Sequence, residues 1–180
     1  MRIITSIVSF LPRVRGGGTS IRKAKKNGLK VGNNLHCAPS VFIDPAHCFL
    51  ITIGDDCTLT SKVHILAHDA STKIHLGYTK IGKVTIGNRV FIGVGTIVLP
   101  NSTIGDDSII GVGSIVVGNI PPREVWAGQP ARKICTLDEY IAKHGDKPFF
   151  GREYQLNPGL SEEKKQEMRQ AVENGIAYIV

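Results

Sequence analysis

The stretch that decides the fold runs from Ile86 to Val116 and reads IGNRVFIGVGTIVLPNSTIGDDSIIGVGSIV. An aliphatic residue recurs in it at every sixth position, at Ile86, Ile92, Val98, Ile104, Ile110 and Val116. A helix repeats its apolar face about every 3.6 residues and a half-buried strand every second residue, so neither explains a period of six. The stretch is therefore a structural repeat with short sides.

The residues between the aliphatic positions are also regular. Glycine follows directly in four of the six cases, at Gly87, Gly93, Gly105 and Gly111. The fourth position after each aliphatic residue is mostly small or β-branched, as in Val90, Thr96, Ser102, Ser108, Ser114 and Ile120. This pattern predicts a solenoid in which aliphatic residues point inward and stack, small residues turn the corners, and glycine supplies corner conformations. Three sides would close one coil of about eighteen residues.

The same spacing extends upstream, with two interruptions. It is clear at Ile53, Leu59 and Ile65, and weaker at Val31, Cys37 and Ile43. The step from Ile43 to Ile53 is ten residues and the step from Ile65 to Ile86 is twenty-one, and neither is a multiple of six. An insertion cannot enter the packed interior, so each must project outward. Projecting loops often carry binding and catalytic residues, and the larger insertion begins directly after His68.

The composition bounds the classes of function. The chain has 20 Gly, 6% aromatic residues and a net charge of +7, with a cluster of basic residues at Arg13, Arg15, Arg22, Lys23, Lys25 and Lys26. The cluster is consistent with a solvated face or with attraction of an anionic cofactor or substrate. Nucleic-acid binding is the least favoured interpretation, because no aromatic residues alternate with the charges to stack on bases. The four cysteines have no metal or redox spacing, and we expect them to be reduced.

The two ends of the chain differ from the repeat. Residues 1–30 form an N-terminal segment with a short helix predicted at 19–28, and residues 136–180 form a helical extension with N-caps at Thr136 and Ser161. The solenoid occupies 31–135, with its loop at 69–83. The apolar run at residues 3–11 is too short to span a bilayer and lacks a signal-peptide cleavage site. It could lie on a neighbouring subunit or on a membrane surface, and we expect a cytoplasmic protein.

The six-residue repeat and the tail WAGQPARKI, residues 126–134, resemble the hexapeptide-repeat acyltransferases. Within that family the chain is most similar to galactoside and maltose acetyltransferases and to their relatives in bacterial surface-polysaccharide loci. The resemblance covers residues 31–135 and implies a mainly β fold, a left-handed parallel β-helix. It also implies a homotrimer in which acetyl-CoA lies between two subunits and a carbohydrate hydroxyl is acetylated.

The resemblance assigns roles to individual residues. It makes His68 the general base, since a positioned histidine suits proton abstraction near neutral pH, and it gives the backbone N–H of Val94 to the developing oxyanion. The positions that map to acetyl-CoA binding are Val94, Val112, Gly113, Val117, Gly118, Trp126, Arg132 and Lys133. The family often has a Thr-Lys pair where this chain has Val117 and Gly118, which removes one phosphate contact.

The acceptor site is predicted from polar residues near the two insertions. Asp69, Tyr78 and Lys80 lie in the larger loop, and Lys73 is a further candidate there. Asp44 lies at the first insertion and is predicted to face the same cleft. Asp69 could alternatively orient the imidazole of His68.

Three alternatives remain open at this point. A zinc enzyme of the γ-class carbonic anhydrase kind has the same repeat and would need imidazoles such as those of His36, His64 and His68 to converge at a boundary between subunits. An N-acetyltransferase acting on an amino sugar would share the fold and the donor. A non-catalytic scaffold would bind no coenzyme A.

Overall fold

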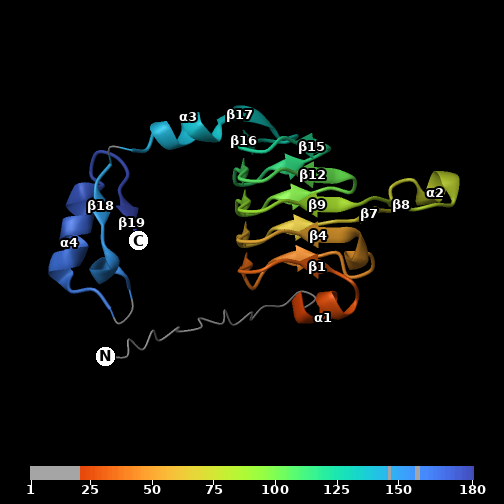
Figure 1. Ribbon diagram of the computed structural model, residues 1–180, viewed down its shortest axis with the longest axis horizontal. Coiled ribbons are helices and arrows are strands. Elements are labelled where there is room, and N and C mark those ends of the chain that lie inside the picture. The colour runs from red at the N-terminus through yellow and green to blue at the C-terminus, as the bar shows by residue number, and fades with distance from the viewer. Residues whose placement is uncertain (1–20, 146, 157–158) are drawn as a thin grey trace, which may run out of the picture. The chain divides into compact units, whose positions relative to one another are not determined.

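The computed structural model describes residues 21–145, 147–156 and 159–180, and its main body is a stack of coils whose strands form three parallel sheets (Figure 1). The first sheet contains β1 (Lys30–Val31), β4 (Ile51–Ile53), β9 (Val84–Ile86), β12 (Ser102–Ile104) and β15 (Asn119–Ile120). The second contains β2 (His36–Cys37), β5 (Thr58–Leu59), β10 (Phe91–Ile92), β13 (Ile109–Ile110), β16 (Glu124–Ala127) and the antiparallel β17 (Arg132–Thr136). The third contains β3 (Phe42–Ile43), β6 (His64–Ile65), β11 (Ile97–Val98) and β14 (Ile115–Val116).

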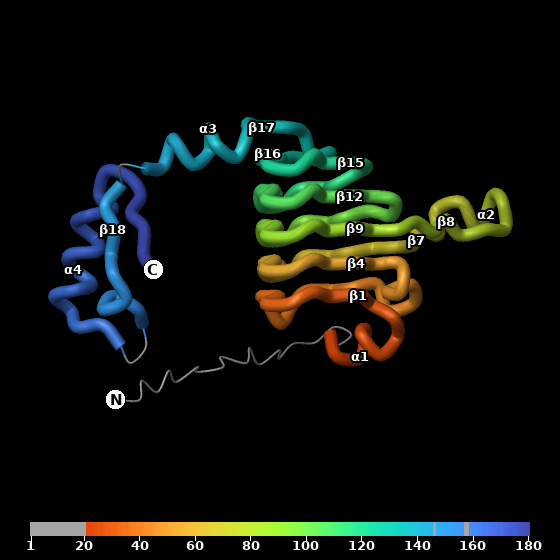
Figure 2. Tube along the Cα trace, in the orientation of Figure 1, coloured from red at the N-terminus to blue at the C-terminus, as the bar shows by residue number. Residues whose placement is uncertain are grey.

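The pairing register confirms the six-residue repeat. Ile86 pairs with Ile104, Ile92 with Ile110, and Val98 with Val116, so residues eighteen apart stack on the same side. The six repeat residues from Ile86 to Val116 are at most 1% exposed and form the centre of the core. The tube in Figure 2 shows these coils lying one above another. Each fully buried aliphatic side chain contributes roughly 1.5–3 kcal/mol through removal from water.

The upstream coils stack in the same way once the insertions are allowed for. Ile43 pairs with Ile65 across twenty-two residues, because the first insertion adds four residues to that coil. This insertion contains the short 3₁₀ helix Cys48–Leu50, whose Cys48 is buried.

The small residues at the fourth position are buried rather than exposed at corners. Thr96, Ser108 and Ser114 are fully buried. Their hydroxyls donate to backbone carbonyls, Thr96 to Gly111 at 3.0 Å and Ser108 to Pro121 at 2.9 Å. A larger side chain would find no room there, and a purely apolar one would leave these carbonyls with one partner fewer.

The glycines that follow the aliphatic residues have a different role from the one the sequence suggested. None of Gly87, Gly93, Gly105 and Gly111 has a positive φ; the left-handed corner positions belong to other residues, among them Asn34, Arg89 and Gly95. A Cβ added at Gly93 would lie 2.6 Å from the backbone nitrogen of Val112 in the next coil. Glycine is needed at this position because two coils approach closely there.

Replacing Gly93 with alanine should therefore destabilise the solenoid. Overpacking against the backbone of the next coil typically costs about 1–3 kcal/mol, which corresponds to a fall in Tm of roughly 2–12 °C for a chain of this size. Thermal unfolding followed by circular dichroism measures it.

The matched control for this prediction is Gly95→Asn in the same coil. Gly95 has φ +71° and no atom within 4 Å of an added Cβ, and asparagine tolerates this conformation. Equal Tm values for the two variants would contradict the close-approach explanation.

Both ends of the solenoid are covered. Helix α1 (Ile21–Lys26) begins the described chain and contributes the fully buried Ala24, whose carbonyl accepts a hydrogen bond from the Cys48 thiol at 3.6 Å. At the other end β17 pairs antiparallel with β16, an element that the six-residue repeat does not predict. These coverings protect strand edges that would otherwise be open to pairing with other chains.

The larger insertion forms a hairpin arm. Strand β7 (His68–Asp69) pairs antiparallel with β8 (Lys80–Ile81), and the short helix α2 (Lys73–Leu76) lies between them. Figure 1 shows the arm projecting from the side of the coils. The antiparallel pairing provides hydrogen-bond partners for the backbone of the arm, which lies outside the solenoid.

The remaining residues form a second compact unit, Asp138–Val180. Helix α3 (Leu137–Ala142) precedes a parallel pair of strands, β18 (Phe149–Phe150) and β19 (Tyr178–Ile179), and helix α4 (Glu162–Ala171) lies between those strands in sequence, after the 3₁₀ helix Arg152–Tyr154. Ser161 caps α4 by accepting a hydrogen bond from the amide of Lys164 at 3.3 Å. The unit thus contains strands as well as the predicted helices.

Some of the sequence predictions concern residues that the structure does not describe. The apolar run at 3–11 and the basic residues Arg13 and Arg15 are not among the residues that the structure describes. Within the described ranges, no helix combines the length and apolar character needed to cross a bilayer. All four cysteines are free.

Candidate functional site

His68 forms a short hydrogen bond with a buried carboxylate. Its Nδ1 lies 2.5 Å from Oδ2 of Asp44, which also accepts the backbone N–H of Ala67 at 3.0 Å. The Asp44 side chain is fully buried, whereas that of His68 is 36% exposed. The stacking of β3 on β6 creates this contact, because Asp44 follows Ile43 and Ile65 lies three residues before His68.

The electrostatics of Asp44 fix the form of the imidazole. Burial alone raises the pKa of Asp44 and is the largest single effect, but hydrogen bonds from His68 and from three backbone amides together lower the pKa below its ordinary value. The backbone amides of Ala46 and His47 complete the set at 3.0 and 3.1 Å. An ionised carboxylate only accepts hydrogen bonds, so the proton of neutral His68 lies on Nδ1 and the lone pair on Nε2.

The position of Asp44 differs from the sequence prediction, which placed it in the acceptor cleft. A fully buried carboxylate that accepts four hydrogen bonds cannot also contact an acceptor. Asp69, the alternative orienting residue, instead points to the arm and pairs with Lys80. Asp44 is thus the carboxylate that contacts the imidazole, whereas Asp69 remains a candidate for the acceptor site.

His47 is a second histidine at the site that the sequence analysis did not single out. Its ring centroid lies 4.9 Å from that of His68, and its Nδ1 lies 3.9 Å from Oδ1 of Asp44. It belongs to the first insertion, three residues after Asp44. The signal that could have found it is the same pairing of Ile43 with Ile65, which brings this insertion beside the start of the arm.

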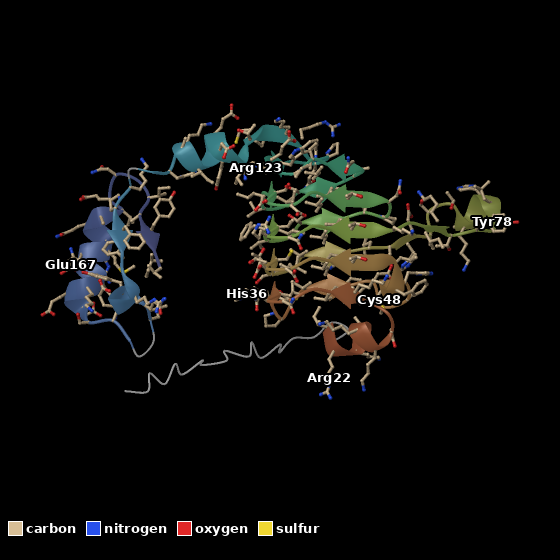
Figure 3. The ribbon with its side chains drawn as sticks, in the orientation of Figure 1. Arg22, His36, Cys48, Tyr78, Arg123 and Glu167 are labelled. Atoms are coloured by element: carbon tan, nitrogen blue, oxygen red, sulfur yellow. The ribbon has the colours of Figure 1, made fainter. Side chains whose placement is uncertain are left out.

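A pocket of about 420 Å³ lies at the base of the arm and brings several predicted residues together. Its walls are Asp69, Lys80, Ile81, Leu99, Pro100, Asn101 and Val117. Lys80 Nζ lies 2.6 Å from Asp69 Oδ2. Hydrogen bonds from Lys80, and then from Ser71, lower the pKa of Asp69 to about 2. Tyr78 is not a wall of this pocket: it is 76% exposed and lies at the far end of the arm in Figure 3.

Val94 belongs to a different pocket of the same chain. This second pocket has a volume of about 400 Å³ and is lined by residues of β2 and β5 with their flanking turns, His36, Cys37, Ala38, Thr58, Leu59, Thr60 and Ser61, together with Val94. The backbone amides on either side of Val94 donate to Ile110 and Ser61. Among the residues that the structure describes, the N–H of Val94 itself donates no hydrogen bond, and the same is true of Val112 one coil further on.

The other predicted donor-site positions lie on the outside of the later coils. Val112 and Val117 are 73% and 59% exposed. Gly113 and Gly118 have φ of +64° and +79°, and Gly113 donates its N–H to the carbonyl of Val94 at 2.7 Å. The two valines are therefore apolar surface without a covering element within the described chain.

The tail places its three predicted residues in different surroundings. Trp126 pairs with Ile110, packs against the core, and donates Nε1–H to Glu124 at 2.7 Å. Lys133 lies 2.6 Å from the same glutamate. Arg132 is exposed, and its guanidinium donates to the carbonyl of Ala131 at 3.0 Å.

The histidines needed for the zinc-enzyme alternative do not meet within one chain. His36 lies on the second sheet, and His64 lies on the third with its Nδ1 3.0 Å from the carbonyl of Lys62. Among the described residues, the single group of three side chains close enough to share a metal ion is Asp44, His47 and His68.

The stacked six-residue coils define the chain as a hexapeptide-repeat protein. No protein-family model matches it. The protein CapG of Staphylococcus aureus is 41% identical over 128 residues, 67% of this chain and 73% of CapG. The galactoside O-acetyltransferase of Escherichia coli K12 is 34% identical over 140 residues, 72% of this chain and 64% of that enzyme.

A solved structure of a galactoside acetyltransferase in complex with coenzyme A has the same fold. It superposes with a TM-score of 0.52 and 27% identity, over 68% of this chain and 72% of that one. With these relatives, the chain belongs to the hexapeptide-repeat acetyltransferases.

Proposed function

We propose that the protein is an acetyl-CoA-dependent O-acetyltransferase that acetylates a hydroxyl of a sugar or surface-polysaccharide precursor, with His68 as the general base. The observation that carries this proposal is the hydrogen bond from His68 Nδ1 to the buried Asp44. The family of the chain supports the acetyl donor, since the related galactoside acetyltransferase was solved with coenzyme A. The name of the Escherichia coli relative supports a sugar hydroxyl as the acceptor.

The chemistry follows from the proton positions. The lone pair on His68 Nε2 takes the proton of the acceptor hydroxyl as its oxygen attacks the thioester carbonyl carbon. The imidazolium that forms is stabilised by the carboxylate of Asp44. When the tetrahedral intermediate collapses, the carbon–sulfur bond breaks and the coenzyme A thiolate takes the proton from Nε2 of the His68 imidazolium, which regenerates the neutral base. The products are an acetyl ester and coenzyme A.

We further propose a homotrimer of left-handed solenoids with each active site between two subunits. In one chain the pocket of Val94 does not include His68, which suits a site assembled from two copies. The unbonded N–H of Val94 would then donate to the oxyanion that develops beside the partner's histidine.

The donor is proposed to lie along the later coils and the tail. The exposed Val112 and Val117, with the turns at Gly113 and Gly118, offer an apolar surface to the pantetheine arm. Trp126 supports this surface from the core side, and Lys133 is held by Glu124, so Arg132 is the better phosphate ligand.

Replacing Arg132 with alanine should raise the KM for acetyl-CoA by about tenfold and change kcat much less. The reason is loss of a charge-assisted contact to a phosphate, worth about 1.5 kcal/mol on an exposed site. Initial rates at varied acetyl-CoA measure it, with the exposed Arg152→Ala as the matched control. An unchanged KM would remove Arg132 from the donor site.

The acceptor is proposed to enter at the pocket at the base of the arm. Asp69 and Lys80 offer an acceptor and donors of hydrogen bonds to sugar hydroxyls there. The exposed Tyr78 at the arm's end could contribute to an acceptor site on another copy of the chain rather than its own.

The test is release of free thiol from acetyl-CoA over a panel of glycosides, nucleotide sugars and amino sugars. We expect acceptor-dependent release and a product whose acetyl group is removed by mild alkali, as an ester is. A product stable to alkali and formed only with amino sugars would mean N-acetylation. If no member of the panel supported thiol release and the protein also failed to bind coenzyme A, the non-catalytic scaffold would be favoured.

A further inference from the structure

Three side chains at the proposed active site form a group that could hold a metal ion. One ligand atom from each of Asp44, His47 and His68 lies within 4.8 Å of the other two. The three residues come from two insertions that are far apart in sequence and are brought together by the pairing of β3 with β6. The proposed acetyl transfer uses only two of them.

Within the described chain, the third residue, His47, has a ring nitrogen that is free to bind a metal ion. Its Nδ1 is buried and has no hydrogen-bond partner among the described residues, and it lies 3.9 Å from Asp44 Oδ1. Its backbone N–H is fixed to the same carboxylate oxygen at 3.1 Å. A buried polar atom without a partner usually has a ligand, a water or a functional role.

The chemistry of the group matches a borderline transition-metal ion. Two imidazoles and one carboxylate suit Zn²⁺ and its neighbours in the first transition row, whereas Mg²⁺ and Ca²⁺ prefer oxygen ligands alone. Asp44 is fully buried, but His47 and His68 are 28% and 36% exposed. An ion can therefore arrive from the histidine side, and water can complete its coordination.

We propose that Asp44, His47 and His68 form a binding site for Zn²⁺ or a chemically similar ion, and that the bound ion switches off the base. Ligands of one tetrahedral zinc ion lie roughly 3.3 Å apart, given bond lengths of about 2.0–2.1 Å. His68 Nδ1 and Asp44 Oδ2, now at 2.5 Å, would separate by less than about 1 Å to admit it.

The switch follows from the tautomers of imidazole. A metal on Nδ1 of His68 occupies that lone pair, so the ring proton must move to Nε2. Nε2 then has no lone pair with which to accept the proton of the acceptor hydroxyl. Inhibition rests on the proposed function of His68, whereas binding of the ion does not.

The experiment separates these two claims. Purified full-length chain, freed of metal with a chelator, is titrated with Zn²⁺ by calorimetry and with Co²⁺ by visible absorption. We expect one ion per chain. The variants His47→Ala and His47→Phe should weaken binding at least tenfold, and the second keeps an aromatic ring beside His68. The matched control, His64→Ala, should bind like wild type.

The same proteins are then assayed for acetyl transfer at increasing Zn²⁺. Each rate is divided by the metal-free rate of the same protein. The concentration giving half inhibition should rise at least tenfold in both His47 variants. Absence of stoichiometric binding, or equal binding by wild type and both His47 variants, would overturn the metal site. Stoichiometric binding with full activity would leave the site standing and overturn the role of His68 as the base.

Discussion

The variant His68→Ala is expected to transfer acetyl groups at about 10²–10⁴-fold lower kcat than the wild type, the usual contribution of a positioned general base. Asp44 binds Nδ1 of the imidazole and leaves Nε2 free. Among the described residues, the His68 ring lies closer to this carboxylate than the His47 ring does, at 2.5 Å against 3.9 Å. The KM for acetyl-CoA should change little, because the proposed donor surface lies on the later coils. Thiol release with the best acceptor of the panel measures both constants.

The matched control is His75→Ala. His75 is an exposed histidine in α2 of the same arm, so its loss removes an imidazole without touching Asp44. If His68→Ala kept full transfer while folding normally, the mechanism would be wrong and the base would have to be sought elsewhere.

The variant Asp44→Asn is expected to lose activity to a similar degree, through the tautomer of His68. An amide has one oxygen where the carboxylate has two, and both carboxylate oxygens accept N–H groups here. If the amide nitrogen faced His68, the ring proton would move to Nε2 and the base would be lost. If it faced the amides of Ala46 and His47 instead, donors would oppose donors and the fold would be weakened, by about 1–3 kcal/mol.

A double-mutant cycle distinguishes positioning from a separate effect on stability. If Asp44 acts only through His68, the double variant should be about as slow as His68→Ala alone, since residues that act as a unit are not additive. Thermal unfolding of each variant records the structural cost separately. Asp56→Asn serves as the control, because Asp56 is an exposed aspartate in the turn between β4 and β5, outside the proposed sites, and its φ of 55° is one that asparagine tolerates. Multiplication of the two single effects in the double variant would show that Asp44 acts independently.

The sequence alone predicted the solenoid because its period is set by packing. Only aliphatic residues fit the inward positions, so the stacks of Ile86 on Ile104 and Ile92 on Ile110 can be read from spacing. The arm has no such period, and its pairing of His68 with Ile81 depends on contacts that spacing does not reveal. The role of the glycines was misread for a similar reason, since Gly93 is set by the approach of the next coil.

The sequence indicated the individual residues of the candidate site to different extents. His68 could be selected because it precedes the larger insertion, and the structure adds its partner. The orienting role of Asp44 required knowledge that four inserted residues leave Ile43 stacked on Ile65. His47 had no signal of its own, because a histidine in an insertion matters only when its neighbours in space are known. These roles remain proposals that the variants above will decide.

The stacking of strands in the second sheet also fixes a distance along the solenoid, between the tail and the coil that leads into His68. Strand β16 lies three strands along from β5, the strand that the coil leading into His68 contributes to the second sheet. Neighbouring strands are about 4.8 Å apart, so the two levels are separated by roughly 14 Å. The number of coils therefore fixes the reach demanded of any molecule that spans from the tail to His68. A homologue with one coil more or fewer would keep the same stacking between neighbouring coils, yet a co-substrate that spans from the tail to the histidine would need a different length.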